Sequence, residues 1–141
     1  MTDRREAILE RLVTVCAISG INTVARNRLT FNATEFPAIG ILEGDEEAKE
    51  TDPEARPANA PRNVTMIPEI VIMLGDTPED VGASINAFKI ALHQVLTTDT
   101  ALLALVVNGR RVRYLGMGSG LGYGRDMEAT IALRYGFTYL L

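Results

Sequence analysis

The sequence predicts an α+β fold, a mainly antiparallel sheet of about four to five strands packed with two helices. Two segments carry apolar residues at helical spacing, and the other segments are β-rich and joined mostly by short connections. The composition, 47% hydrophobic and 23% charged over 141 residues, fits one globular domain covering 1–141. The expected order is helix, strand, strand, long polar arm, strand, helix, strand, strand.

The first predicted helix covers Asp3–Ala17. Asp3 followed by Glu6 has the spacing of a capping box, in which both side chains bond free amides of the first turn. Ser19-Gly20 is expected to end the helix, because glycine suits the turn after a C-terminus. The apolar residues that share one helical face are Ile8, Leu9, Leu12, Val13 and Cys16.

Two short strands are predicted next, Val24–Leu29 and Phe36–Glu43, with a turn region at Thr30–Glu35 between them. Pro37 suits the start of the second strand or a sheet edge, because proline cannot donate to a β-ladder.

A polar arm follows, from Glu43 to Arg62. Thr51 is its only β-branched or aromatic residue, so the arm cannot bury a core of its own. Loops of this length are uncommon in compact domains and are usually functional or disordered. We therefore expect a flexible acidic arm over about 43–62 that orders only against a partner.

The strongest strand signal is Asn63–Leu74. Pro68 lies within it and suggests a bulge or an edge position. The second helix, Thr77–Leu96, is the best-signalled element, with Thr77 as N-cap and Pro78 at its first position. Its apolar stripe consists of Val81, Ile85, Phe88, Leu92 and Val95.

Two further strands complete the prediction. After a short turn at Ala101–Leu105, Asn108-Gly109 marks a tight turn and a strand covers Arg111–Met117. Apolar and polar residues alternate along Met127–Leu140, which predicts the last strand. The glycine series Gly116–Gly124 is expected to be a flexible connection between these two strands.

The glycine series does not support nucleotide binding. No frame within it matches the dinucleotide-binding spacing, and a strand follows it where a helix would be needed. Alternate glycines could instead leave one face of a ribbon bare, so that the backbone of a neighbouring subunit lies close.

Residues that would carry chemistry are few. His93 is the one histidine and is expected on a helix surface, without the second histidine or cysteine that a zinc site needs. Cys16 is the one cysteine, so an intrachain disulfide is excluded. The acidic residues of the arm lack the spacing of an EF-hand loop. We therefore expect no catalytic residues, no metal and no cofactor, and a protein that is not an enzyme.

Charge and hydropathy restrict the partners. The formal net charge is −4 and the pI is near 5.0, which argues against a basic nucleic-acid interface. The charged N-terminus shows no signal peptide, and no apolar run reaches the ~18 residues of a membrane span. Synthesis in the cytoplasm and no membrane partner are the expectations.

The layout of these segments resembles the tail terminator (tail completion) family of long-tailed bacteriophages over most of the chain. The segments that carry the resemblance are the first helix with Arg5 and Ile8–Leu12, the strand entry Glu35-Phe36-Pro37-Ala38-Ile39, the strand Ile67–Leu74, the helix Thr77–Leu96, the segment Leu96–Leu102, and the strands with Tyr114 and Tyr135.

This resemblance implies a structural virion protein of the tail and neck, assembled in the host cytoplasm. Members form a six-fold ring on the last ring of the tail tube, stop tube polymerisation and present a surface to the head–tail connector or stopper protein. The implied partners are thus further copies of the chain, the tail-tube protein and the connector, while DNA passes through the lumen without specific binding.

A head-to-tail ring needs two different complementary patches on each copy. We expect the acidic arm of one copy to meet the Arg110–Arg113 end of the next, so that high salt weakens assembly. The candidate contact residues are Glu46, Glu47, Arg56, Arg62, Arg110, Arg111 and Arg113. Two alternatives stay open: another neck or tube component (a connector, a stopper or a tail-tube subunit), and a small ligand-binding domain.

Overall fold

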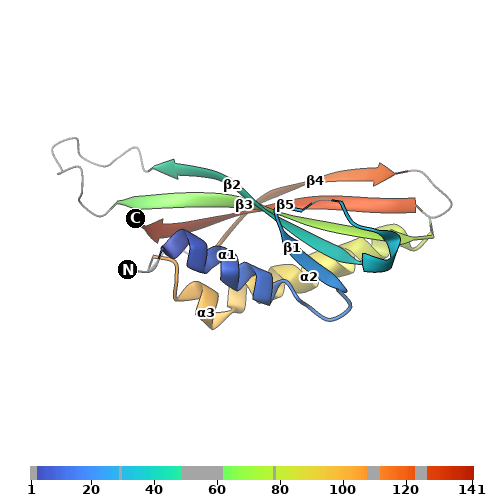
Figure 1. Ribbon diagram of the computed structural model, residues 1–141, viewed down its shortest axis with the longest axis horizontal. Helices are drawn as coiled ribbons and strands as arrows, with labels where there is room; N and C mark the ends of the chain where they lie inside the picture. Colours follow the sequence, from blue (N-terminus) through green and yellow to red (C-terminus); the bar gives the residue numbers. More distant parts are fainter. Residues whose placement is uncertain (1–2, 29, 49–61, 78, 108–111, 123–126) are drawn as a thin grey trace.

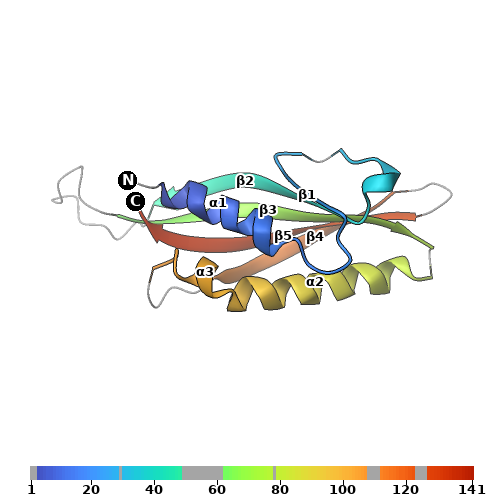
Figure 2. The same ribbon diagram turned by 60° about the horizontal axis from the view of Figure 1, so that its bottom comes forward.

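The computed structural model describes residues 3–28, 30–48, 62–77, 79–107, 112–122 and 127–141. In these ranges a five-stranded sheet carries its helices on one face (Figures 1 and 2). The helices are α1 (Arg4–Val15), α2 (Val81–Thr98) and α3 (Thr100–Leu103), with a 3₁₀ turn η1 (Ala33–Glu35). The strands are β1 (Thr23–Arg26), β2 (Ala38–Ala48), β3 (Asn63–Asp76), β4 (Arg113–Gly122) and β5 (Met127–Leu140). The predicted α+β class is confirmed.

The strand order across the sheet is β1-β2-β3-β5-β4. The pairs β2–β3, β3–β5 and β5–β4 are antiparallel, as the sequence predicts for most of the sheet. β1 pairs with β2 in parallel over only four residues, because the chain between them passes through η1 and returns to start β2 at the same end.

α1 begins at the predicted cap. The Asp3 side chain accepts a hydrogen bond from the amide of Arg5 at 2.9 Å. The second half of the predicted capping box is wrong, because the Glu6 carboxylate binds Arg26 of β1 instead of turning back to Asp3.

α2 starts later than predicted. Val81 is its first residue and Asp80 its N-cap, while Thr77 donates its hydroxyl to Asp80 at 3.0 Å. Asp99 then ends α2 and caps α3 by accepting from the Leu102 amide, so the predicted turn at Ala101–Leu105 is a short helix. Asp99 also receives two hydrogen bonds from Arg11, which fastens α1 to this corner.

The acidic arm begins later than predicted. β2 runs to Ala48 and pairs with β3 from Ala48↔Val64 inward, so Glu43–Ala48 is strand rather than flexible chain. Between Leu42 and Asp45 the register shifts, so that two residues of β2 face Pro68 alone. The bulge suggested by Pro68 is thereby confirmed, on the strand opposite it. Residues 49–61 of the expected arm lie outside the described ranges.

The glycine series is also more ordered than predicted. Gly116–Gly122 belongs to β4 and pairs with β5 from Gly116↔Arg134 to Gly122↔Glu128, so the expected flexible connection is wrong over these residues. The ladder to β5 supplies the hydrogen bonds that a glycine-rich segment could not hold alone. The rest of the series and the predicted Asn108-Gly109 turn lie outside the described residues.

The core lies between the helices and the face of the sheet that they cover. Alternate residues of β3 and β5 point into it, as their period of two requires. Fully buried side chains there include Met66, Ile70, Ile72, Leu133, Tyr135 and Phe137 from the sheet and Ile8, Leu12, Leu92 and Leu96 from the helices. None of the helices in the described ranges is both long and apolar enough to span a membrane.

Candidate functional site

The sheet has two open sides that differ in character. On one side β4 is the edge strand. On the other, β1 covers β2 only from Ala38 to Ile41, so the outer half of β2 extends past its neighbour (Figure 1). Unpaired strand edges are the parts of a sheet that most readily contact another chain. We therefore consider the surfaces around these two sides as the candidate functional site.

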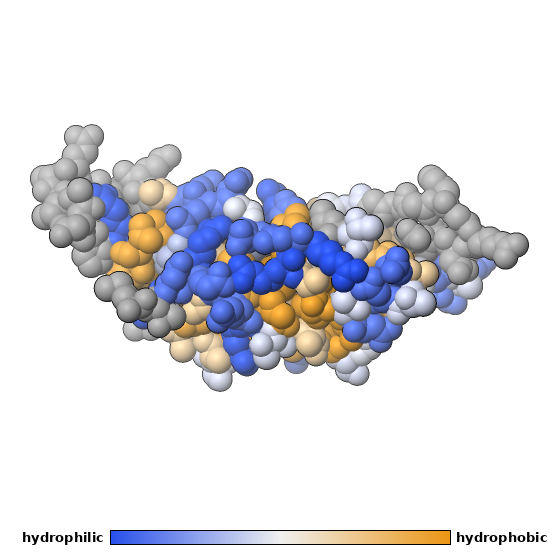
Figure 3. Space-filling model, in the orientation of Figure 1, coloured by the Kyte–Doolittle hydropathy of each residue, from blue (hydrophilic) through white to orange (hydrophobic). Residues whose placement is uncertain are grey.

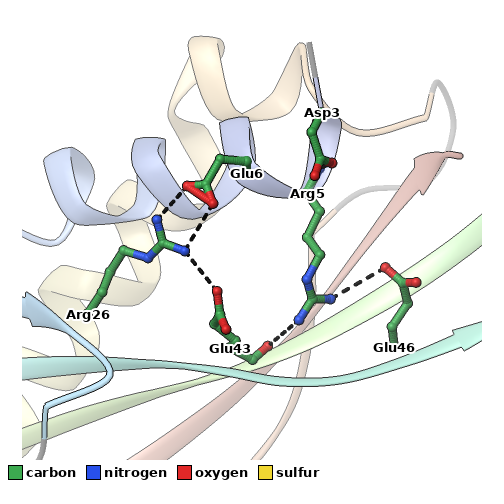
Figure 4. A network of polar contacts seen from close by, with 6 residues as sticks. All are labelled: Asp3, Arg5, Glu6, Arg26, Glu43 and Glu46. Atoms are coloured by element: carbon green, nitrogen blue, oxygen red, sulfur yellow. Dashed lines mark hydrogen bonds and ion pairs between the residues drawn. The ribbon is translucent and has the colours of Figure 1, made fainter. Parts of the chain in front are cut away.

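The outer half of β2 is strongly acidic. Its sequence from Leu42 to Ala48 contains four carboxylates and no basic residue. Two of them, Glu43 and Glu46, belong to a network with α1 and β1 (Figure 4). Arg26 bonds Glu43 at 2.8 Å, and Arg5 lies 3.4 Å from a carboxylate oxygen of Glu46.

The hydrogen bonds and ion pairs of this network connect several secondary-structure elements. Arg26 also holds Glu6 of α1, and the hydrogen bond from Arg26 lowers the pKa of the Glu6 carboxyl. The Tyr139 hydroxyl of β5 donates to Glu46, and burial raises the pKa of Tyr139 to about 12. These contacts tie the first helix, β1, β2 and β5 together, so Glu43 and Glu46 are already occupied within the chain.

The remaining two carboxylates of β2, Asp45 and Glu47, are available. Both are exposed, and both point to the sheet face that the helices leave open, since they are in register with Ile67 and Thr65 of β3. Neither forms an ion pair within the described ranges. Leu140 of β5 lies at the same end of this face and is 49% exposed. We name Asp45, Glu47 and Leu140 the acidic end.

Apolar surface is also exposed around the C-terminus, beside the acidic end. Viewed as in Figure 1, hydrophilic residues cover much of the molecule, and an apolar area appears beside the C-terminus (Figure 3). The acidic end therefore combines negative charge with apolar contact area.

The opposite side of the sheet carries a shallow groove between α2 and β4. It is lined by Lys89, Ile90, His93 and Tyr114, encloses about 200 Å³ and is almost wholly apolar. Ile90 is 68% exposed and Tyr114 41%. Met117, two positions beyond the β4 bulge, is exposed as well. We name these five residues the α2–β4 groove.

The aromatic residues of the groove are held in place from below. His93 Nδ1 lies 2.8 Å from the hydroxyl of Tyr135, and the Tyr114 ring stands edge-on to the His93 ring with centroids 5.8 Å apart. Burial raises the pKa of Tyr135 to about 12, so its hydroxyl stays neutral and available for this bond. The Lys89 ammonium lies 5.6 Å from the Tyr114 ring centroid, over its face.

The charge on the residues that line the groove is positive. Neither α2 nor β4 contains an aspartate or glutamate, whereas Lys89 contributes a cation to the groove. Among the described residues no carboxylate pairs with Lys89. Arg113, the charged residue of β4, is in register with Gly136 and points to the open face of the sheet instead. The two sides of the sheet thus offer complementary charge together with apolar area.

The predicted contact residues fall into three groups. Glu47 is exposed at the acidic end, and Glu46 beside it is held by Arg5 and Tyr139. Arg113 is exposed at the start of β4, and the Arg62 backbone pairs with Leu141. Arg56, Arg110 and Arg111 lie outside the described residues. The structure therefore places Glu47 on β2 and Arg113 on the edge strand β4, with β3 and β5 between the two strands.

Sequence reasoning missed the groove. Ile90 falls off the apolar stripe that predicted the second helix, which was a signal that it serves another contact. Tyr114 and Met117 were assigned to a strand without a reason for their exposure. The contact of Tyr114 with α2 depends on packing between elements far apart in the sequence.

The described residues show no cluster for metal binding. Within those ranges no three His, Cys, Asp or Glu side chains come together in a way that could hold a metal ion. Cys16 is fully buried, and its pKa is raised to about 12 by burial, so the thiol is protonated and inert.

Comparison with known proteins bears on the fold. No protein-family model matches the chain. No curated protein matches it either. Among solved structures, the chain is similar to a chain in the virion of a native gene transfer agent particle, with 13% identity, a TM-score of 0.54, and coverage of 95% of this chain and 92% of that one. A second solved structure is 17% identical over 94% of this chain and 92% of that one, with a TM-score of 0.47. The first likeness shows a shared fold along nearly the whole chain.

Proposed function

We propose that this chain is a structural virion protein of a phage-like particle. In this proposal it forms a ring at the head-proximal end of the tail tube, stops tube polymerisation and provides the surface for head or neck joining. The carrying observation is the fold shared over 95% of the chain with a protein of the gene transfer agent virion. The resemblance of its strand and helix layout to the tail terminator family supports the finer assignment.

The two unlike sides of the sheet support a ring. A cyclic head-to-tail assembly uses two different patches on each subunit, whereas a two-fold dimer uses one patch twice. The acidic end and the α2–β4 groove differ in charge, and both expose apolar side chains. Such a pair favours closed rings or open filaments over dimers.

Two side chains with reactive potential are engaged within the fold. Cys16 is buried, and His93 is hydrogen-bonded to Tyr135. A groove of about 200 Å³ is also smaller than the usual pocket for a substrate or cofactor.

The mass of the purified protein tests this proposal. We expect light scattering after size exclusion to give either a closed ring, at about six times the 15.4 kDa of the chain, or a monomer that caps tubes. Negative-stain images of the protein mixed with tail tubes of the same particle should show one cap at one end of each tube. Tubes capped in this way should stop growing when more tube protein is added.

The other assembly roles give different results. Open-ended tubes formed by the chain alone would identify a tube subunit. A lasting monomer that ignores tubes but binds the connector would identify a neck component, and one that binds neither would contradict an assembly role. DNA should show no binding at physiological salt in any of these cases, because the chain has a net charge of −4.

A further inference from the structure

We propose that the α2–β4 groove is the seat for the acidic end of a neighbouring copy of this chain. The inference rests on the proposed ring and specifies which surfaces meet in it. Each copy would place its acidic end on the groove of the next copy, so every subunit would use both surfaces once.

The groove has the form of a seat for one or two apolar side chains. Ile90 exposes 68% of its surface next to the ring of Tyr114, and Met117, further along the same strand as Tyr114, exposes 42%. Contiguous exposed apolar residues of this kind mark contact sites on soluble proteins. A volume of about 200 Å³ fits a side chain such as leucine better than a cofactor.

The seat is rigid. His93 is bonded to the buried Tyr135, and Tyr114 packs against both rings, with its centroid 5.5 Å from that of Tyr135. The groove therefore needs little ordering when it is occupied, which favours binding.

Charge identifies the occupant as a second copy. The groove contains Lys89, which has no acidic partner among the described residues, and no carboxylate from α2 or β4. The acidic end presents Asp45 and Glu47, which likewise lack a cation in those ranges, and adds the half-exposed Leu140. The Lys89 ammonium beside an apolar hollow thus matches two carboxylates beside an apolar side chain.

The positions of the two surfaces also suit a heterologous contact. They lie on opposite faces of the sheet: Asp45, Glu47 and Leu140 point to the face that the helices leave open, and the groove lies where β4 meets α2. A single copy cannot join them to each other, because the sheet itself stands between them. Two neighbouring copies can join the acidic end of one to the groove of the other. Once the ring closes, the acidic end and the groove of every copy are covered.

Disulfide trapping tests the contact directly. Copies carrying Ile90→Cys would be mixed under mild oxidation with copies carrying Leu140→Cys and a mass tag. The native Cys16 is buried and does not interfere. Mixed dimers should exceed each homodimer by about tenfold, because only the mixed pair brings groove and acidic end together. Mixed dimers no more abundant than homodimers would overturn the inference.

A charge swap tests the electrostatic part. Lys89→Glu alone and Glu47→Lys alone should each reduce the association constant by about tenfold at low salt, and the double variant should recover most of it. Two controls leave both surfaces intact: Ala91→Glu adds a carboxylate to the other flank of α2, and Glu10→Lys reverses an exposed charge on α1. Both controls should assemble like the unaltered chain.

The outcomes separate this inference from the proposed ring function. Rings that form normally in both single charge variants, without mixed disulfides, would leave the ring in place and reject the groove as its seat. Mixed disulfides in a chain that never caps tubes would support the contact and reject tail termination. Groove variants that lose binding to tube or neck protein but keep self-association would assign the groove to that other partner and reject the inference.

Discussion

Replacing Gly44 by alanine should destabilise the protein more than the same change at Gly116 or Gly118 of β4. Gly44 lies in the β2 bulge with φ +66°, a left-handed conformation that glycine adopts without strain. A Cβ atom placed on it would lie 1.9 Å from the carbonyl oxygen of Ile67 and 2.8 Å from its carbon. The backbone of β2 or β3 must therefore move to admit a methyl group.

The expected cost has two parts. A left-handed alanine costs roughly 1–2 kcal/mol by itself. Separating the strands at the bulge weakens one or two ladder hydrogen bonds, at about 1 kcal/mol each. We therefore expect the free energy of unfolding to fall by about 3 kcal/mol, which leaves a domain of ordinary stability folded.

Two other glycines provide matched controls. Gly116 has φ +135°, but a Cβ there meets nothing within 4 Å, so Gly116→Ala should cost only the conformational part, about 1–2 kcal/mol. Gly118 has neither a positive φ nor a close neighbour, so Gly118→Ala should change stability by less than about 0.5 kcal/mol.

Urea unfolding, followed by circular dichroism, measures all three variants. The order of cost should be Gly44, then Gly116, then Gly118. If Gly44→Ala costs no more than Gly116→Ala, the close approach to Ile67 does not limit the bulge and the reasoning fails. The Gly44 variant should also weaken assembly, because Asp45 and Glu47 follow the bulge and take their direction from it.

Three further predictions concern the core and the ion pair that joins α1 to the end of α2. Ile72→Ala, at a fully buried position of the central strand, should lower the free energy of unfolding by about 2–5 kcal/mol in the same urea experiment, and a smaller loss would mean that the core collapses around the cavity. The hydrogen bonds from Arg11 lower the pKa of Asp99, so the stability they contribute is present above the unfolded-state pKa near 3.8 and is lost as pH falls through the lower folded-state pKa. Asp99→Asn should therefore reduce the loss of stability at acid pH. An unchanged loss in this variant would assign it to other carboxylates. Because burial raises the pKa of Cys16 to about 12, its thiol should not react with a disulfide reagent at about pH 8 until urea unfolds the chain, and rapid labelling of the native protein would contradict the packing of α1.

Local signals in the sequence predicted the elements whose stability is local. The Asp3 cap, the apolar stripe of α2 and the alternation along β5 all depend on neighbours within a few residues, and the structure confirms them. Pro68 predicted an irregularity for a chemical reason, its missing amide, and the bulge lies opposite it.

Segments that depend on distant partners were predicted poorly. Glu43–Ala48 has weak strand propensity, yet it is a strand because Val64–Ile67 offers a ladder. The glycines of β4 are strand for the same reason, with β5 as the partner. The sequence alone does not show which segments will pair, so an acidic or glycine-rich stretch beside a strong strand looks like a loop.

The candidate site could be predicted only in part. Glu47 and Arg113 were chosen for their charge, and the strand order then placed them on opposite sides of the sheet. The groove depends on α2 crossing β5 and reaching β4, a long-range contact that periodicity does not report. Ile90 could have been recognised as an apolar residue outside the buried stripe, although its neighbours could not.

The difference between the two open sides is itself an argument for assembly. Proteins usually protect an exposed strand edge with charges, prolines or bulges, because a bare edge invites pairing with other chains. The outer half of β2 follows this practice with four carboxylates. β4 does not, since it has one charged residue, Arg113, no proline, and exposed Tyr114, Leu115 and Met117. An edge that is apolar on one side of the sheet only, opposite an acidic one, is a liability in a free monomer. In the proposed ring a second copy would cover it, which would turn this liability into a specific contact.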